Sequence, residues 1–188
     1  MLHGSSRIVR VLRKDGFLVG DEEIKCRNNQ GRQAIRQLNS ILWDKAVSKE
    51  NKHKIYNSIV KSIISYGSEV WPLKERNLKL LEATEMDFWR RAAGKSQLDR
   101  VRNERIRISE DIKINQLRWY GHVQRMEENR IPKKILNWTP QGKSKRGRPR
   151  RSWREGIDGD IRTRGIDENL WTDRDQWRLE IRRRRRTL

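Results

Sequence analysis

Residues 48–67, SKENKHKIYNSIVKSIISYG, carry the clearest helical pattern in the chain. Their apolar side chains recur at the helical period, and polar side chains fill the other half of the helical wheel. Ser48 suits the position before a helix, and Gly67 suits the position after one. The pattern predicts one amphipathic helix that needs a partner helix. Its apolar face comprises Ile55, Tyr56, Ile59, Val60, Ile63, Ile64 and Tyr66.

Helices are predicted on both sides of this segment. The first begins at Asp21, as its N-cap, and runs to about Trp43, with Asn28 and Gly31 weakening its apolar face. Another runs from about Asn77 to Gly94. A charged stretch at 96–108 is expected to form a short helix with a connector, and a further helix starts near Ser109.

The two ends of the chain have different patterns. Residues 7–19 contain a β-branched run, a Lys14-Asp15-Gly16 turn and a second apolar run, which predicts a β-hairpin. Residues 129–188 hold 19 Lys and Arg against 8 Asp and Glu. Prolines and glycines argue against regular structure between about 130 and 150. Short helices are expected at 151–164 and 173–186.

The predicted fold class is therefore mainly α. A small helical bundle is preceded by a short β-hairpin and followed by a partly disordered basic C-terminal region with short helices. The expected divisions are 1–20 for the hairpin, 21–128 for the bundle and 129–188 for the basic arm. Of the 188 residues, 34% are hydrophobic and 37% charged, against about 25% charged in typical domains, so the core must be thin.

The net charge of +20 indicates a polyanionic partner, and nucleic acid is the default, with acidic membrane surfaces and acidic proteins as alternatives. No apolar run approaches the roughly 20 residues that span a bilayer, and the first ten residues lack the pattern of a signal peptide. We therefore expect DNA or RNA as partner, no membrane and no small-molecule substrate. The single cysteine, Cys26, indicates a reducing compartment, and the expected location is nuclear or in a cytoplasmic ribonucleoprotein.

Patterns typical of catalysis are missing from the sequence. It has no Asp-Asp pair, although polymerases and nucleases cluster carboxylates around two divalent cations. Asp158-Gly159-Asp160 and Asp173-Arg174-Asp175 stand in basic surroundings and are interpreted as charge-balancing residues. The sequence has neither zinc-ligand spacing, nor a phosphate-binding loop, nor a nucleophile motif. We expect no catalytic residue, no metal and no cofactor.

Basic residues instead form three candidate contact regions for nucleic acid. On the helix after Ser109, one side carries a basic stripe opposite the apolar stripe. Downstream, the run KRGRPRR resembles the core of an AT-hook, whose arginines enter an A·T-rich minor groove; non-specific phosphate contact or a nuclear-localisation signal are the alternatives. The chain ends in five arginines. The candidates are Arg118, His122, Arg125, Lys145, Arg146, Gly147, Arg148, Pro149, Arg150, Arg151, Arg182, Arg183, Arg184, Arg185 and Arg186.

The eight tryptophans divide by context. Trp89 and Trp119 lie on apolar helix faces and are interpreted as core residues, because aromatic side chains mostly serve burial. Trp138, Trp153, Trp171 and Trp177 stand in basic stretches with few apolar residues, so they are freer to contact the bases of a ligand.

The order of several sequence blocks points to a known family. The blocks are DEEIKCRNNQGRQAIRQLNSILW, KIYNSIVKSIISYGSEVW, LEATEMDFWRRAAG, LDRVRNERI, LRWYGHVQRM, RIPKKILNW and RGRPRRSWREGI. Together they resemble the C-terminal part of the endonuclease–reverse transcriptases of non-LTR retrotransposons, over about residues 13–181. The resemblance implies that Lys14-Asp15-Gly16 closes the polymerase palm. It also implies that residues 21–94 are thumb-like and grip a template–primer duplex.

Two features depart from that family. Its catalytic aspartates belong upstream of residue 1, and Asn28 stands where the family usually has an apolar residue. A buried, unpaired amide costs about 1–3 kcal/mol, so Asn28 suggests a decaying copy of the element. The leading hypothesis is a truncated, catalytically inactive reverse-transcriptase fragment that still binds nucleic acid, with Mg²⁺ serving only the full-length enzyme. The alternatives are a domesticated AT-hook-like DNA-binding protein and a genomic relic without a cellular role.

Overall fold

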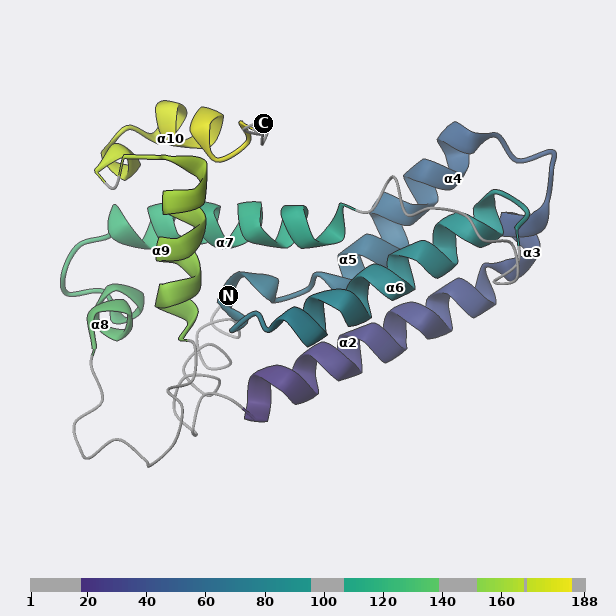
Figure 1. Ribbon diagram of the computed structural model, residues 1–188, viewed down its shortest axis with the longest axis horizontal. Coiled ribbons are helices and arrows are strands. Elements are labelled where there is room, and N and C mark those ends of the chain that lie inside the picture. The colour runs from purple at the N-terminus through teal and green to yellow at the C-terminus, as the bar shows by residue number, and fades with distance from the viewer. Residues whose placement is uncertain (1–17, 96–106, 139–151, 168, 184–188) are drawn as a thin grey trace. The chain divides into compact units, whose positions relative to one another are not determined.

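The computed structural model is mainly helical, as predicted, and every regular element among the residues it describes is a helix (Figure 1). The described residues form two compact units, divided between Ile112 and Lys113 within helix α7 (Ile108–Gln124). In the part of the chain described, no helix is both long and apolar enough to cross a membrane. The described residues are 18–95, 107–138, 152–167 and 169–183.

The expected β-hairpin lies largely outside the described residues, and none of those described forms a strand. Leu18 and Val19, expected in its second strand, are the first residues of α2 (Leu18–Gln37), so this part of the prediction was wrong. Asp21 is consequently inside the first turn and not at the N-cap. An acidic residue favours a helix from either position, because the N-terminal end of the helix dipole is positive.

The segment 48–67 is helical but not one regular α-helix. It comprises α4 (Lys49–Ile55), a π-helical turn (Tyr56–Val60) and α5 (Lys61–Ile64). The predicted start is confirmed, because Ser48 Oγ accepts from the Asn51 N–H at 3.3 Å. The helix ends at Ile64, three residues before the predicted Gly67, which has a φ of 74° and precedes the 3₁₀ turn Ser68–Val70. Within the expected apolar face, Tyr56, Val60 and Ile64 are buried, whereas Ile59 and Tyr66 are exposed.

Gly31 is where α2 meets α5. A Cβ atom at Gly31 would lie 2.2 Å from Ile64 Cγ2, so only glycine allows this contact between the two helices. The expectation that Gly31 weakens the apolar face was wrong, because its missing side chain is what admits Ile64. Helix α6 (Glu75–Ala92) also packs on α2 and runs alongside it in the first unit (Figure 1).

Asn28 is buried but not unpaired. Its side chain is 1% exposed, and its Oδ1 accepts a hydrogen bond from Thr84 Oγ1 of α6 at 2.7 Å. The expected cost of an unpaired amide is therefore offset, since a hydrogen bond replaces lost contacts with water. Asn28 gives no sign of decay in this core.

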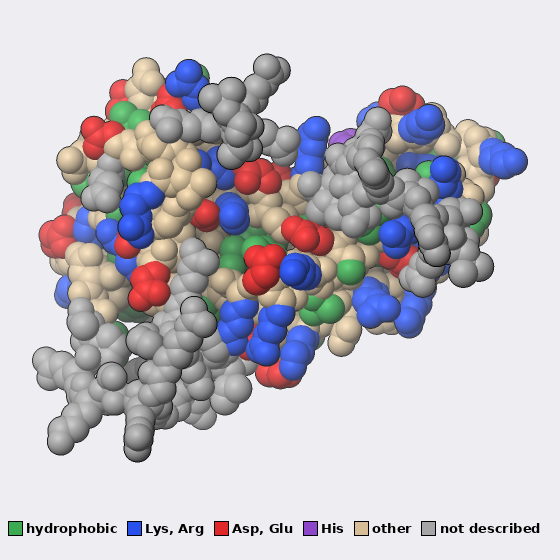
Figure 2. Space-filling model, viewed as in Figure 1, with side chains coloured by type: hydrophobic (Ala, Val, Ile, Leu, Met, Phe, Trp, Pro, Cys, Tyr) green, Lys and Arg blue, Asp and Glu red, His purple; other side chains and the backbone are tan. Residues whose placement is uncertain are grey.

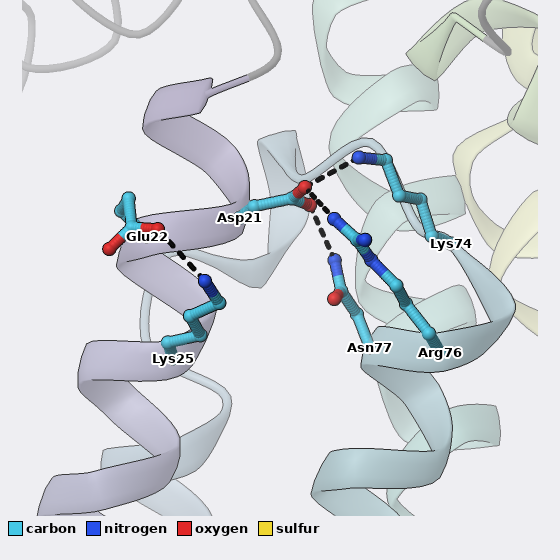
Figure 3. Close-up of polar contacts among 6 residues, drawn as sticks. All are labelled: Asp21, Glu22, Lys25, Lys74, Arg76 and Asn77. Carbon is cyan, nitrogen blue, oxygen red and sulfur yellow. Dashed lines mark hydrogen bonds and ion pairs between the residues drawn. The ribbon is translucent and has the colours of Figure 1, made fainter.

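A second buried polar contact joins the beginnings of α2 and α6 (Figure 3). The Asp21 carboxylate accepts from Lys74 Nζ, Arg76 Nη2 and, at 2.8 Å, Asn77 Nδ2. Burial alone would raise the pKa of Asp21, but the hydrogen bonds from Lys74, Asn77 and Arg76 outweigh it and hold that pKa below its ordinary value. Glu22 and Lys25 form a separate pair on the outer side of α2 (Figure 3).

A third polar contact joins α6 to the start of α7. The buried Glu85 Oε2 accepts from the N–H groups of Arg107 and Ile108, each at 2.9 Å, which pairs donors that the first turn of a helix leaves open. Its Oε1 accepts from Tyr56 Oη at 2.8 Å. Burial first, and the Glu85 charge second, raise the pKa of Tyr56, so its hydroxyl stays protonated.

The apolar core of the first unit draws on α2, the α4–α5 segment, α6 and the first turn of α7. Trp89 is half-buried and packs against this core, which agrees with its predicted role. The buried residues are Ile24, Ile35, Leu42, Tyr56, Val60, Ile64, Trp71, Leu81, Phe88, Ile108 and Ile112.

The second unit contains the remainder of α7, α8 (Ile131–Asn137), α9 (Trp153–Arg164) and α10 (Arg174–Glu180). Helices α9 and α10 fall where short helices were predicted. Helix α8 corrects the expectation of irregular structure after residue 130. Its Pro132 lies in the first turn, where the missing N–H costs no hydrogen bond and the fixed φ favours the helix.

The second unit has its own buried cluster, which was not expected for a basic arm. Trp177 is 1% exposed, and its Nε1 donates to the Leu117 carbonyl at 3.1 Å. A Cβ at Gly121 would lie 2.4 Å from Trp177 Nε1, so glycine lets the indole lie against the α7 backbone. The cluster comprises Leu117, Tyr120, Ile157, Ile161, Ile166, Trp177 and Ile181.

Candidate nucleic-acid interface

Two of the three predicted basic positions on α7 face solvent. Arg118 and His122 are exposed, one helical turn apart, while Leu117 before them and Tyr120 between them are buried. The His122 ring lies 5.7 Å from the ring of Trp119, and Arg118 Nη1 donates weakly to Asn115 Oδ1 at 3.4 Å. Neither side chain is paired with a carboxylate among the described residues. Both side chains are available to a phosphate.

Arg125, the third position, forms a hydrogen bond within the protein. Its side chain is half-buried, and Nη1 donates to the Trp171 carbonyl at 2.6 Å. Burial lowers the pKa of the guanidinium, and repulsion from Arg174 lowers it further. The contact holds the 3₁₀ turn Leu170–Thr172 against α7, so the geometry gives Arg125 a structural role.

Other Lys and Arg side chains of the second unit also donate hydrogen bonds to carbonyl groups within the protein. Lys133 Nζ donates to the Gln124 carbonyl at 2.6 Å, at the end of α7, and Arg164 Nη1 donates to the Ile181 carbonyl at 2.9 Å. Cations favour the ends of helices because the last carbonyls have no partner within the helix. Arg154 lies over the Tyr120 ring at 4.8 Å. Part of the positive charge counted from the sequence is therefore used within this unit.

The acidic residues of this region also have defined partners. Asp158 Oδ1 accepts from Arg154 Nε at 2.9 Å, and Asp160 lies 3.4 Å from Lys113. Asp173 Oδ1 accepts from the N–H groups of Asp175 and Gln176 and so caps α10. In the described ranges, no group of three His, Cys, Asp or Glu could hold a metal ion.

Most of the other predicted contact residues lie outside the described residues. At the end of α10, Arg182 and Arg183 are exposed, and Arg183 Nη1 lies 3.3 Å from Glu180. The candidates outside the described residues are Lys145, Arg146, Gly147, Arg148, Pro149, Arg150, Arg151, Arg184, Arg185 and Arg186.

The tryptophans are arranged differently from the prediction. Trp177 is buried, and Trp153 and Trp171 are half-buried against the second core, so these three are less free than expected. Trp138 is 63% exposed, as predicted. Trp43 is 44% exposed and was missed, although the run Ile41-Leu42-Trp43 held a signal, because three consecutive helical residues cannot all face one core.

Lys and Arg side chains are scattered over the visible face, with acidic side chains among them (Figure 2). The described surface therefore carries many cations. Such a surface suits an extended polyanion, which contacts many separate cations at once.

Comparison with known proteins gives one informative similarity. The chain is 28% identical, over 159 residues, to an uncharacterized transposon-derived protein of Caenorhabditis elegans. The match covers 74% of this chain and 57% of that protein, so the chain spans little more than half of the relative's length. No protein-family model matches the chain, and no solved structure matches it. The similarity supports a transposon-related origin.

Proposed function

We propose that this chain is the nucleic-acid-binding part of a transposable element, equivalent to the region after the catalytic palm in non-LTR retrotransposon reverse transcriptases. Its origin is supported by the similarity to a transposon-derived protein along 74% of the chain. The finer assignment is supported by the ordered sequence blocks between residues 21 and 157 that resemble that family. The helical first unit then corresponds to a thumb that holds a template–primer duplex.

One observation supports the binding most directly. Arg118 and His122 project from the outer face of α7 while the inner face of the same helix is packed into a core. A rigid helix therefore presents an arginine and a histidine at fixed spacing on a chain whose net charge is +20. Phosphate contacts by such cations release condensed counterions, so the affinity falls as salt rises.

The polymerase reaction, in this proposal, is not carried out by residues of this chain. The sequence contains no Asp-Asp pair to hold two Mg²⁺ ions, and its acidic residues near α9 and α10 serve as ion pairs and caps. The isolated chain is then expected to give no primer extension with Mg²⁺. Detectable extension would overturn this part of the proposal.

Binding is tested by fluorescence anisotropy with a labelled DNA duplex and an RNA–DNA hybrid across a range of salt concentrations. The expected result is a steep loss of affinity with salt, with a smaller slope for Arg118→Ala/His122→Ala than for the intact chain. Arg178→Ala, an exposed cation on α10, is the matched control for a general loss of charge. Affinity that does not change with salt would contradict the proposal.

The AT-hook-like alternative makes a different prediction. The sequence Arg146-Gly147-Arg148-Pro149 favours insertion into a narrow minor groove. Preference for A·T-rich over G·C-rich duplex, lost in Arg146→Ala/Arg148→Ala, would favour this alternative over thumb-like binding. Equal affinity for both duplexes would count against it.

A further inference from the structure

An exposed tryptophan marks one end of the first unit. In α3 (Asn39–Trp43), Trp43 is 44% exposed and Ile41 is 40% exposed, whereas Leu42 between them is fully buried. Leu42 therefore anchors α3 in the core and turns its two apolar neighbours outward.

The indole is held in a fixed orientation. Trp43 Nε1 donates to Asn39 Oδ1 at 3.1 Å, and the same oxygen accepts from Arg91 Nη1 at 2.6 Å. Arg91 is in turn paired with Asp87 through its Nε at 3.1 Å. The tryptophan and the guanidinium thus share one acceptor, which places a cation beside the indole. No other ring is stacked on Trp43 among the described side chains.

Further cations surround this pair. Lys52 Nζ donates to the Ala92 carbonyl at 3.2 Å, which brings the start of α4 to the end of α6. Exposed Lys45 precedes that start, exposed Lys49 is its first residue and exposed Lys95 follows α6; Lys49 also interacts electrostatically with the exposed Glu50 beside it. The Trp43 surface is defined as Ile41, Trp43, Lys45, Lys49, Arg91 and Lys95.

The charge of this end favours an anion. Two nearby carboxylates are already engaged, because Asp44 Oδ1 accepts from the Ala46 N–H at 2.8 Å and Asp87 is paired with Arg91. A third, that of the exposed Glu50, lies beside Lys49 in the first turn of α4. Figure 2 shows Lys and Arg side chains at this end of the first unit, with acidic side chains among them. The Trp43 surface therefore combines an exposed aromatic ring with four Lys and Arg side chains.

We propose that the Trp43 surface binds single-stranded nucleic acid by stacking an unpaired base on Trp43, with the surrounding lysines contacting the flanking phosphates. A duplex hides the faces of its bases within the stack, so it has no face to offer the indole, whereas a single strand has one at each nucleotide. The inference rests on the proposed nucleic-acid binding but uses a surface in the other unit from Arg118 and His122. It adds a preference for unpaired strands that a basic helix face alone does not create.

The test compares a labelled oligothymidine with a labelled duplex on the intact chain and on Trp43→Ala. The expected result is a loss of oligothymidine affinity on the order of 5- to 100-fold for Trp43→Ala, since stacking of one base has this weight, with little change for the duplex. Trp43→Phe, which keeps an aromatic face, should retain most of the affinity. Lys45→Ala/Lys49→Ala should lower the salt dependence of oligothymidine binding.

Tyr66→Ala is the matched control. Tyr66 is 57% exposed in the same unit, but Arg27 lies over its ring at 4.5 Å, so one face is already occupied. This variant should bind oligothymidine as the intact chain does. Urea denaturation of each variant should give an unchanged midpoint, which confirms that the substitutions leave the fold intact.

Four outcomes would overturn the inference. If Trp43→Ala bound oligothymidine as tightly as the intact chain, or lost oligothymidine and duplex equally, the stacking role would be wrong while the proposed function stood. If polyglutamate displaced the strand as well as unlabelled oligothymidine does, the surface would suit an acidic protein instead. If the intact chain bound neither strand nor duplex, the proposed function would fall as well.

Discussion

Thr84 Oγ1 donates a hydrogen bond to Asn28 Oδ1 at 2.7 Å, and both side chains are buried between α2 and α6. This contact replaces an apolar one at the centre of the helix pair. A polar pair satisfied in this way favours one alignment of α2 against α6, because another alignment leaves the Asn28 amide oxygen without its donor. The pair explains why an amide is tolerated within an apolar face.

The Asn28–Thr84 pair can be measured by a double-mutant cycle. Thr84→Val leaves the buried Asn28 amide without its donor and should lower the free energy of unfolding by about 1–3 kcal/mol. Asn28→Leu should cost less, because Thr84 Oγ1 is also 3.4 Å from the Leu80 carbonyl and can turn to it. The double variant should be close to the intact chain in urea denaturation. Strictly additive single effects would show that the two residues do not interact.

Asp21 should make the stability of the first unit depend on acid pH. Its pKa in the folded chain is lowered, so it contributes stability above its unfolded pKa of about 4, and this contribution is lost as the pH falls through the folded value. Asp21→Asn should lower the free energy of unfolding by about 1–3 kcal/mol at neutral pH, because Lys74 and Arg76 lose a charged acceptor.

The measurement for Asp21 is urea denaturation at pH 7 and at successively lower pH values. The difference between Asp21→Asn and the intact chain should shrink as the pH falls. Glu22→Gln is the control, since Glu22 is 70% exposed and pairs only with the exposed Lys25. A difference that stays constant over the whole range would rule out the ionised Asp21 carboxylate as its source.

Gly31→Ala should destabilise the chain by about 1–3 kcal/mol, because a Cβ 2.2 Å from Ile64 Cγ2 forces α2 and α5 apart. Gly156→Ala is the matched control: it is also within a helix, but its Cβ would meet nothing within 4 Å. There the higher helix propensity of alanine should stabilise the chain by up to about 1 kcal/mol. Thermal unfolding of the two variants should therefore shift in opposite directions, and equal shifts would refute the packing argument.

Substitution of Arg118 should affect nucleic-acid binding, and substitution of Arg125 should affect stability, although both residues belong to the same predicted basic stripe. Arg118→Ala should weaken duplex binding and leave stability unchanged within about 0.5 kcal/mol, because Arg118 is exposed. Arg125→Ala should lower stability by about 1–3 kcal/mol, because it leaves the Trp171 carbonyl without its donor. Anisotropy titrations and urea denaturation on the same preparations check both expectations. The reverse pattern would show that Arg125 is the phosphate contact.

The local sequence was enough to determine much of the secondary structure. Ser48 gave the start of the central helical segment, and Gly67 gave its end to within three residues, because capping depends on a few adjacent residues. The apolar period located α6 and α7 within a few residues, and the short helices α9 and α10 were also predicted. Charge alone indicated a polyanionic partner, which stays a prediction.

Predictions from local sequence patterns were wrong at positions whose role depends on residues far away in the sequence. Pro132 was predicted to interrupt regular structure, but the helix tolerates it because it lies in the first turn of α8. Trp177 was interpreted as free because its neighbours in sequence are basic, yet Leu117 and Gly121, more than fifty residues earlier, enclose it. Trp43 was missed because its exposure depends on how Leu42 anchors α3.

A helical, highly basic chain could be predicted from the residues alone, since helix propensity, capping and net charge depend on residues close together or on totals. What the individual polar and charged side chains do depends on the partners that folding brings to them. Asn28 needed Thr84, Asp21 needed Lys74, and Arg125 needed the Trp171 carbonyl, each pair coming from separate segments of the chain. Whether a cation is free for a phosphate or used within the fold depends on such partners, because burial favours groups that are already paired.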